Sequence, residues 1–280
     1  MKGKLIVIPT PIGNLGDLTF RALEALKTVD LLLCEDTRHT VKLLHHYGIR
    51  VPLMSYHKFN EKERTEQIAR RMEKGEFIGL VSDAGMPGVS DPGEILIREL
   101  IRKELAVEVL PGASAVTTAL VGSGLPIASF LFLGFLSGDK RARKEQWNRI
   151  LTAKESVVLY ESPRRIRKTV VQLYEALGDR PIAICRELTK LHEEYIRGNL
   201  SALAENPEQI PEKGEIVLII GPSGREEERA DPKEALEEAL RDMPLSQAVK
   251  AVAKETGLPR NELYETAVRM KEEETDGCDS

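Results

Sequence analysis

The 280-residue sequence has few cysteines, few aromatic residues and no long apolar run. Its three cysteines, Cys34, Cys185 and Cys278, are odd in number and far apart, which argues against a disulfide framework and gives no CxxC metal motif. No segment approaches the roughly 20 apolar residues of a membrane helix, and the five histidines form no HExxH motif. Proline and glycine also interrupt the first residues before the apolar region of a signal peptide could develop. We therefore expect no membrane segment, no bound metal and a cytoplasmic protein.

Acidic residues outnumber basic ones over the whole chain, but positive charge is concentrated in one segment. The formal net charge is −5, which excludes a uniformly basic surface. Residues 140–168 nevertheless contain ten basic and three acidic side chains. A partner rich in phosphate groups therefore stays possible at this segment.

Hydrophobic patterning predicts two kinds of sheet. In the first half, short apolar runs alternate with segments of helical period, which is typical of a mainly parallel sheet covered by helices. The candidate strands are 4–8, 29–34, 77–81, 107–110 and 130–134. A second block from Ser156 has candidate strands at 157–160, 182–186, 195–198 and 215–220, with one clear helix at 163–176. Strands that follow one another without a crossover helix pair antiparallel, so the second sheet should be mixed.

We predict a chain of three parts. An N-terminal α/β domain covers residues 1–111, and a second α/β domain covers residues 112–222. Residues 223–280 form a charged linker and a helical tail. The tail pattern predicts a helix at 245–256, a short turn and a helix at 260–270, which is typical of a helix-turn-helix.

Glycine is concentrated in loops, above all in VSDAGMPGVSDPG at residues 81–93. Neither this loop nor PTPIGNLGDLT after the first strand matches GxGxxG or the P-loop pattern, so the familiar phosphate cradles are absent. Asp83 and Asp91 would repel an anion but suit a ligand with ammonium or sulfonium groups or ribose hydroxyls. S-adenosylmethionine has all of these features. The alternative is structural: both aspartates would only shape turns, with Asp91 capping a helix that begins at Pro92.

The loop VSDAGMPG is also similar to the DxGxGxG loop of Rossmann-type methyltransferases, which makes a plain Rossmann fold the second candidate. That match is imperfect because Pro87 stands where a glycine would be and has no N–H to donate.

Taken in order, the loops resemble the tetrapyrrole (corrin/porphyrin) methylase superfamily, and within it the ribosomal RNA small subunit methyltransferase I family. The matching stretches between Leu5 and Gly221 are IPTPIGNLGDLTFRALE, CEDTRHT, VSDAGMPGVSDPG, LPGASA, GFL, YESPRR, RELTK and KGEIVLIIG. The resemblance implies a two-domain tetrapyrrole-methylase-like fold that binds S-adenosylmethionine between its domains. It also implies 2'-O-methylation of a cytidine ribose in 16S ribosomal RNA of the small subunit, and a homodimer.

The resemblance further implies cofactor contacts in loops of both domains. They fall on Ile12, Gly13, Ala84, Gly85, Met86, Val89, Ser114, Ala115, Tyr160, Leu188 and Glu215. Many superfamily members carry an aspartate where this chain has Met86, so either Asp83, which we add to the predicted contacts, or backbone groups replace that carboxylate.

A ribose hydroxyl is a weak nucleophile, so the reaction needs a base or a cation beside the developing alkoxide. The candidate catalytic residues come from CEDTRHT and RELTK: Asp36, Arg38, Arg186, Glu187 and Lys190, with Glu35 beside them. How the roles divide among them stays open. An ordinary surface ion pair is the alternative for CEDTRHT.

The basic segment supplies the predicted RNA contacts Lys140, Arg141, Arg143, Lys144, Arg164 and Arg165, which would screen backbone phosphates. A solvated helix face is the alternative. Trp147 is predicted to lie in the core, with stacking on a base as its alternative.

Two other functions of the whole chain stay open: a methylase of tetrapyrrole or corrinoid precursors, and a ligand-sensing transcription regulator that contacts DNA through its tail.

Overall fold

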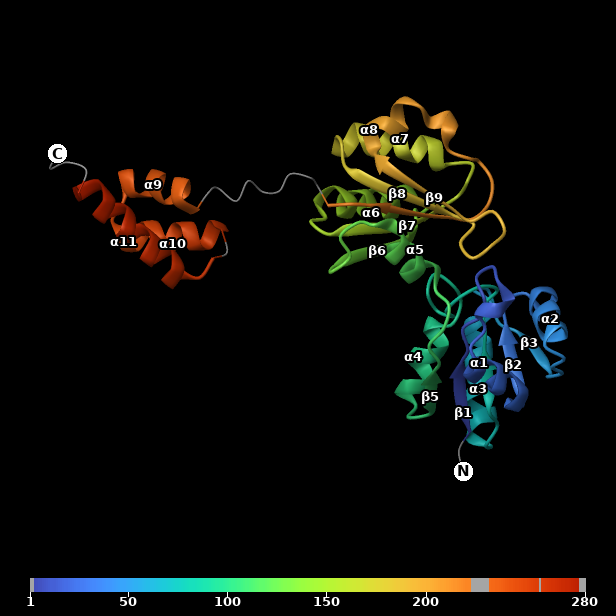
Figure 1. Cartoon of the computed structure of the whole chain (residues 1–280). Helices are drawn as coiled ribbons and strands as arrows, with labels where there is room; N and C mark the ends of the chain where they lie inside the picture. Colours follow the sequence, from blue (N-terminus) through green and yellow to red (C-terminus); the bar gives the residue numbers. More distant parts are fainter. Residues whose placement is uncertain (1–2, 223–231, 257, 277–280) are drawn as a thin grey trace. The chain divides into compact units, whose positions relative to one another are not determined.

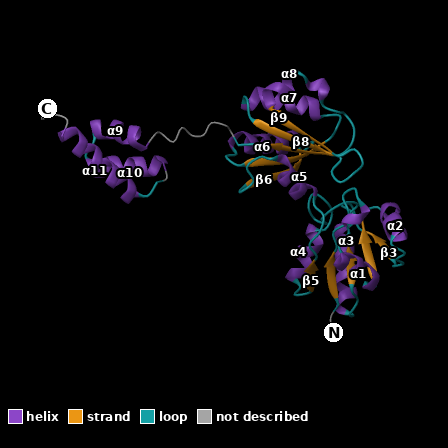
Figure 2. Cartoon of the chain, in the orientation of Figure 1, coloured by secondary structure: helices purple, strands orange, loops and turns teal. Residues whose placement is uncertain are grey.

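The computed structural model describes residues 3–222, 232–256 and 258–276, and the chain divides into two compact units, 1–222 and 223–280. Most of the predicted linker, at 223–231, and Cys278 lie outside the described residues. The first unit contains two five-stranded sheets, each packed against helices (Figures 1 and 2). The predicted α/β class is confirmed.

The first sheet has the order β3-β2-β4-β1-β5, and all its paired strands run parallel. The strands are β1 (Lys4–Val7), β2 (Leu31–Cys34), β3 (Leu53–Ser55), β4 (Ile78–Leu80) and β5 (Ala106–Val109). The helices are α1 (Phe20–Thr28), α2 (Thr37–His46), α3 (Glu61–Glu73) and α4 (Glu94–Arg102), with a 3-10 turn η1 (Leu15–Asp17). Side chains of α3 and α4 pack on one face of this sheet, and side chains of α1 and α2 pack on the other. Burial on both faces explains why a strand such as LLLC is continuously apolar.

The second sheet has the order β6-β7-β10-β8-β9. Its strands are β6 (Phe130–Phe135), β7 (Ser156–Glu161), β8 (Pro181–Arg186), β9 (Glu194–Asn199) and β10 (Ile216–Ile220). β6 runs parallel to β7, whereas the other pairs are antiparallel, so the predicted mixed sheet is confirmed. The strand expected at 130–134 exists, but it pairs in the second sheet rather than continuing the first.

Four helices and a 3-10 turn complete this part of the first unit. They are α5 (Ala115–Ser123), α6 (Lys140–Thr152), α7 (Ile166–Leu177), α8 (Leu200–Glu205) and η2 (Pro207–Gln209). The core on one face of the second sheet is built with α6, α7 and α8, and the core on the other face with α5.

The second unit is a small helical bundle of α9 (Pro232–Asp242), α10 (Leu245–Thr256) and α11 (Arg260–Asp276). Its core contains Leu236, Val249, Val252, Leu263 and Ala267. The helix expected at 245–256 is present with those bounds, and the following helix extends beyond residue 270. Within the described parts of the chain, no helix is both long and apolar enough to cross a membrane.

Candidate functional site

The loops that follow β1, β2 and β4 meet at one edge of the first sheet, because parallel strands bring their carboxyl ends together there. Thr10 and Gly85 join two of these loops through a pair of backbone hydrogen bonds of 2.9 and 3.0 Å. The backbone N–H of Asp36 donates to Oδ1 of Asp83 at 3.2 Å and ties the β2 loop to the same place. The glycine-rich loop 81–93 is therefore the centre of this edge.

Glycine is required at the turn of this loop. Gly85 has a φ of 81° and Gly88 a φ of 84°, a conformation that residues with side chains rarely adopt. A Cβ on Gly85 would also lie 3.2 Å from Cγ2 of Ile12. The turn thus brings backbone, rather than a side chain, close to the residues of the β1 loop.

A cavity of about 460 Å³, here called the acidic cavity, opens beside this loop and is also lined by residues of the second sheet. All the predicted cofactor contacts except Gly13 line it. Its wall also includes Asp91, for which a ligand contact and a structural role were both left open, Glu161, which adjoins the predicted contact Tyr160, and Phe135, which was not expected to contact the cofactor. Phe135 belongs to the GFL stretch and Glu161 to YESPRR, so both lay within motifs already recognised.

The acidic cavity has carboxylates from four chain segments and no lysine or arginine among its described lining residues. Burial, then the charges of Glu35 and Asp83, raise the pKa of Asp91 to about 6. Burial and the charge of Asp83 also raise the pKa of Glu35. Carboxylates that resist ionising beside one another favour a positively charged ligand, which would relieve their repulsion.

The structure contradicts the alternative that Asp91 caps a helix beginning at Pro92. The helix α4 begins at Glu94, and its N-cap is Gly93, whose φ of 136° is accessible to glycine alone. Asp91 is instead partly buried in the wall of the acidic cavity.

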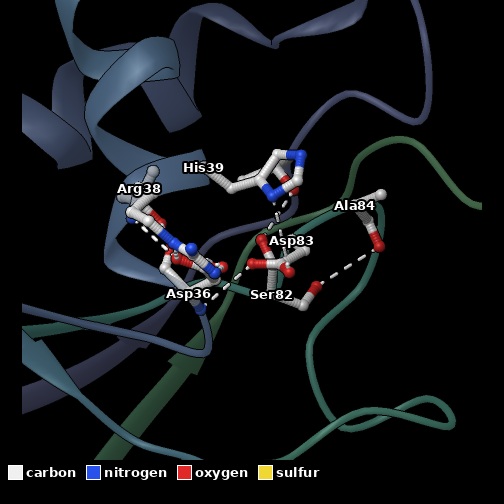
Figure 3. Close-up of polar contacts among 8 residues, drawn as sticks. Asp36, Arg38, His39, Ser82, Asp83 and Ala84 are labelled. Atoms are coloured by element: carbon white, nitrogen blue, oxygen red, sulfur yellow. Dashed lines mark hydrogen bonds and ion pairs between the residues drawn. The ribbon is translucent and has the colours of Figure 1, made fainter.

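A second cavity of about 330 Å³, here called the cationic cavity, adjoins the first. Ile12, Asp83, Ala84 and Glu215 line both cavities. The cationic cavity also has the basic side chains His39, Lys42 and Lys190, together with Gly13. Figure 3 shows His39 directed toward Asp83, with 3.9 Å between Nδ1 and Oδ2. A group bound in the cationic cavity would therefore face a group bound in the acidic cavity across a shared wall.

Lys190 lies in the loop that follows β8, and two carboxylates hold its side chain. Its Nζ lies 2.9 Å from Oε1 of Glu187 and 3.2 Å from Oε2 of Glu215. Partial burial alone would lower the pKa of Lys190, but its hydrogen bonds with Glu187 and Glu215 raise it above the usual value. Lys190 is thus a fixed positive charge at neutral pH rather than a proton acceptor.

The loop with Lys190 is strained and packs tightly against the β1 loop. Glu187 and Thr189 have positive φ values of 52° and 63°. The backbone N–H of Asn14 donates to Oγ1 of Thr189 at 3.1 Å. A Cβ on Gly13 would lie 2.5 Å from Cγ of Lys190 and 2.8 Å from the carbonyl oxygen of Leu188. Gly13 is therefore needed for this close approach, although it does not line the acidic cavity.

Of the other candidate catalytic residues, Glu35 lines the acidic cavity, whereas Asp36, Arg38, Arg186 and Glu187 line neither cavity. Asp36 caps α2 by accepting from the N–H of Arg38, and its carboxylate also binds the Arg38 guanidinium at 2.6 Å (Figure 3). These hydrogen bonds lower the pKa of Asp36 to about 2. Arg186 binds Glu194 at 3.0 Å, and Glu187 reaches the site only through Lys190 and the N–H of Glu215.

The predicted RNA contacts lie on α6 and in the turn before α7. Lys140, Arg141, Lys144 and Arg164 are exposed. Arg143 and Arg165 line a separate cavity together with Trp147, which also packs against the core of the second sheet.

Comparisons with known proteins match this architecture. The family model for Tetrapyrrole (Corrin/Porphyrin) Methylases matches residues 4–204, and the model for the RsmI C-terminal HTH domain matches residues 226–271. The ribosomal RNA small subunit methyltransferase I of Synechocystis sp. is 42% identical over 276 residues, which cover 96% of this chain and 99% of the relative. The chain belongs to the ribosomal RNA small subunit methyltransferase I family. The Thermotoga maritima relative is 43% identical over 229 residues. These residues cover 80% of the present chain and the whole length of the relative.

Solved structures share the fold of this family member at low sequence identity. The methyltransferase CobJ is 17% identical with a TM-score of 0.61, covering 79% of this chain and 95% of its own. A uroporphyrin-III C-methyltransferase from Thermus thermophilus, solved with S-adenosyl homocysteine, is 19% identical with a TM-score of 0.54. The match covers 78% of this chain and 97% of the solved one. These likenesses show a tetrapyrrole-methylase fold.

Proposed function

We propose that this chain transfers a methyl group from S-adenosylmethionine to the 2'-hydroxyl of a cytidine in 16S ribosomal RNA. The observation that carries the proposal is the pair of adjoining cavities, one acidic and one cationic, that share a wall. The family name of the relatives supports ribosomal RNA of the small subunit as the substrate.

The residues of the acidic cavity fit S-adenosylmethionine, which supplies an electrophilic methyl group when bound. Glu35, Asp83 and Asp91 match its positive charges and ribose hydroxyls, and no cationic side chain opposes them among the described lining residues. Small residues such as Gly85 and Ala115 leave room in the wall. A carboxylate in contact with the sulfonium would stabilise the reactant more than the transition state, so Glu35 and Asp91, which line the acidic cavity but not the cationic one, should hold the amino end and the ribose.

The cationic cavity fits the acceptor nucleotide. Lys42 and Lys190 provide positive charge for a phosphate or for the alkoxide that develops on the ribose oxygen. A preorganised charge at a developing oxyanion is worth about 10²- to 10³-fold in rate. Asp83 lies on the shared wall, where its Oδ2 can accept the hydroxyl proton as the oxygen–carbon bond forms.

The test offers labelled S-adenosylmethionine and three acceptors to the full chain: small subunits from cells that lack the activity, naked 16S ribosomal RNA, and uroporphyrinogen III. We expect label in RNA and none in the tetrapyrrole. Label in the tetrapyrrole alone would replace the proposal by methylation of corrinoid precursors. Dimer formation stays a prediction from the resemblance, and a cytoplasmic location stays a prediction from the sequence.

A further inference from the structure

A third cavity, of about 530 Å³, lies between α6 and α7 and belongs to neither cavity of the proposed reaction. We call it the α6–α7 cavity. It is lined by Arg143, Trp147, Arg165, Lys168, Thr169 and Gln172. Its size falls within the range of small-molecule sites, and all of its described lining residues are neutral or cationic.

The cations of the α6–α7 cavity are available for a ligand. Arg143 and Lys168 form no ion pair with any residue that the structure describes. Arg165 donates its Nε to Oε1 of Glu161 at 2.9 Å, while its terminal nitrogens have no hydrogen-bond partner among the described residues. A guanidinium fixed in this way presents a planar pair of donors to a phosphate.

Glu161 does not line the α6–α7 cavity but holds two residues that do, Arg165 and Thr169. It is 3% exposed, and its carboxylate also accepts from Oγ1 of Thr169 at 2.8 Å and from the N–H of Ser162 at 2.7 Å. Because Glu161 also lines the acidic cavity, one buried carboxylate stands between the two cavities. Arg165 is therefore held in place by the same residue that borders the proposed cofactor site.

Two further side chains point to a nucleobase rather than to a phosphate alone. Oε1 of Gln172 is buried without a hydrogen-bond partner, and such an acceptor is costly unless a donor reaches it. Exocyclic amino groups of nucleobases are donors of this kind. Trp147 supplies an aromatic surface in the same cavity, and single-stranded RNA is commonly recognised by stacking of unpaired bases on aromatic side chains.

We infer that the α6–α7 cavity binds one unpaired nucleotide of the RNA substrate, with its phosphate at Arg143, Arg165 and Lys168 and its base at Trp147 and Gln172. The inference rests on the proposed function and adds to it a subsite separate from the methylated nucleotide. Of these residues, Lys168 and Gln172 lie outside the basic contacts expected from the sequence.

The test compares two double variants that remove equal charge. Arg143→Ala with Lys168→Ala changes the cavity, whereas Arg70→Ala with Lys74→Ala removes two exposed charges that line none of the cavities described above. We expect the cavity variant to raise the KM for small subunits by roughly 10- to 100-fold, since each lost charged hydrogen bond weakens binding by about tenfold or more. The control should change KM by no more than about threefold. Unchanged binding of S-adenosyl homocysteine in both variants shows that the fold is intact.

A second readout uses Trp147, the only tryptophan in the chain. A single-stranded RNA dodecamer should quench its fluorescence saturably in the wild type and in the control, and inorganic phosphate should not. Quenching by phosphate alone, or equal KM changes in both double variants, would overturn the inference. Methylation that proceeds equally well in all three proteins would overturn only the subsite, whereas a wild-type chain that methylates no RNA would overturn the proposed function itself.

Discussion

Replacement of Asp91 by asparagine tests the electrostatic account of the acidic cavity. Asp91 has a pKa raised to about 6 by burial and by the charges of Glu35 and Asp83. A group whose pKa is higher in the folded than in the unfolded state favours folding in its protonated form. The stabilisation that protonated Asp91 contributes to folding is therefore fully present below about pH 4 and is lost as the pH rises through about 6. Above pH 6 the wild type carries a repulsion that Asp91→Asn removes.

The expected change in the free energy of unfolding follows from the shift in the pKa of Asp91. A change from 3.8 to about 6 corresponds to an upper limit of about 3 kcal/mol, at 1.36 kcal/mol for each unit. Because the Asp91 side chain is partly exposed, solvent screening reduces this to about 1 kcal/mol. Asp91→Asn should thus raise the free energy of unfolding by about 1 kcal/mol at pH 8 and leave it unchanged at pH 4. The same variant should bind S-adenosylmethionine about tenfold more weakly at pH 8, because a cation stabilises the ionised carboxylate.

Urea unfolding followed by Trp147 fluorescence measures the first effect, since this tryptophan lies in the unit that carries the cavity. Equilibrium titration of S-adenosylmethionine between pH 5 and 8 measures the change in cofactor affinity, which should rise more steeply with pH in the wild type than in Asp91→Asn. Glu175→Gln, which changes an exposed carboxylate outside the cavity, is the matched control. Identical pH dependence in Asp91→Asn and the wild type would refute the reasoning.

Three further outcomes follow from the structure. Gly13→Ala should lower the free energy of unfolding by about 1–3 kcal/mol in urea titrations, because its Cβ would meet Cγ of Lys190 at 2.5 Å; unaltered stability would contradict this tight approach. Lys190→Met should lower kcat about 10²- to 10³-fold while S-adenosyl homocysteine binds normally, and unimpaired turnover would remove Lys190 from the mechanism. A chain ending at Pro222 should retain cofactor affinity by calorimetry, since residues 1–222 form their own compact unit; loss of binding would assign the tail a role in the site.

Most strands could be predicted because buried parallel strands are continuously apolar, as in LLLC of β2 and IVLII of β10. The strand β3 was missed because it has only three residues, LMS, all of them partly buried. Such a short strand owes its existence to pairing with β2 rather than to its own pattern.

The position of the site was predictable, but the direction of individual side chains was not. Loops after parallel strands meet at one sheet edge, which is why the glycine loops identified the acidic cavity. The pattern SDPG reads locally as a helix start, and only the φ of Gly93 shows that the helix begins later and leaves Asp91 facing Glu35 and Asp83. Asp36 and Arg38 follow Glu35 directly, yet they neutralise each other outside the cavity.

Two basic residues of the cationic cavity had a sequence signal that was not used. His39 and Lys42 are three residues apart on α2, so they share one face of that helix. The helix begins directly after Asp36, so this face is carried to the edge where the glycine loops meet. Helical spacing read onward from CEDTRHT would have predicted both residues.

The position of the transferred methyl group distinguishes methylation of a cytidine ribose from every alternative reaction. Small subunits lacking the modification are incubated with the full chain and labelled S-adenosylmethionine, and their RNA is digested to nucleosides for mass spectrometry. The proposed function predicts label in 2'-O-methylcytidine alone, because the proposed charge of Lys190 favours reaction at a ribose hydroxyl and the resemblance implies cytidine. Label on a base, or on the ribose of another nucleoside, would contradict it.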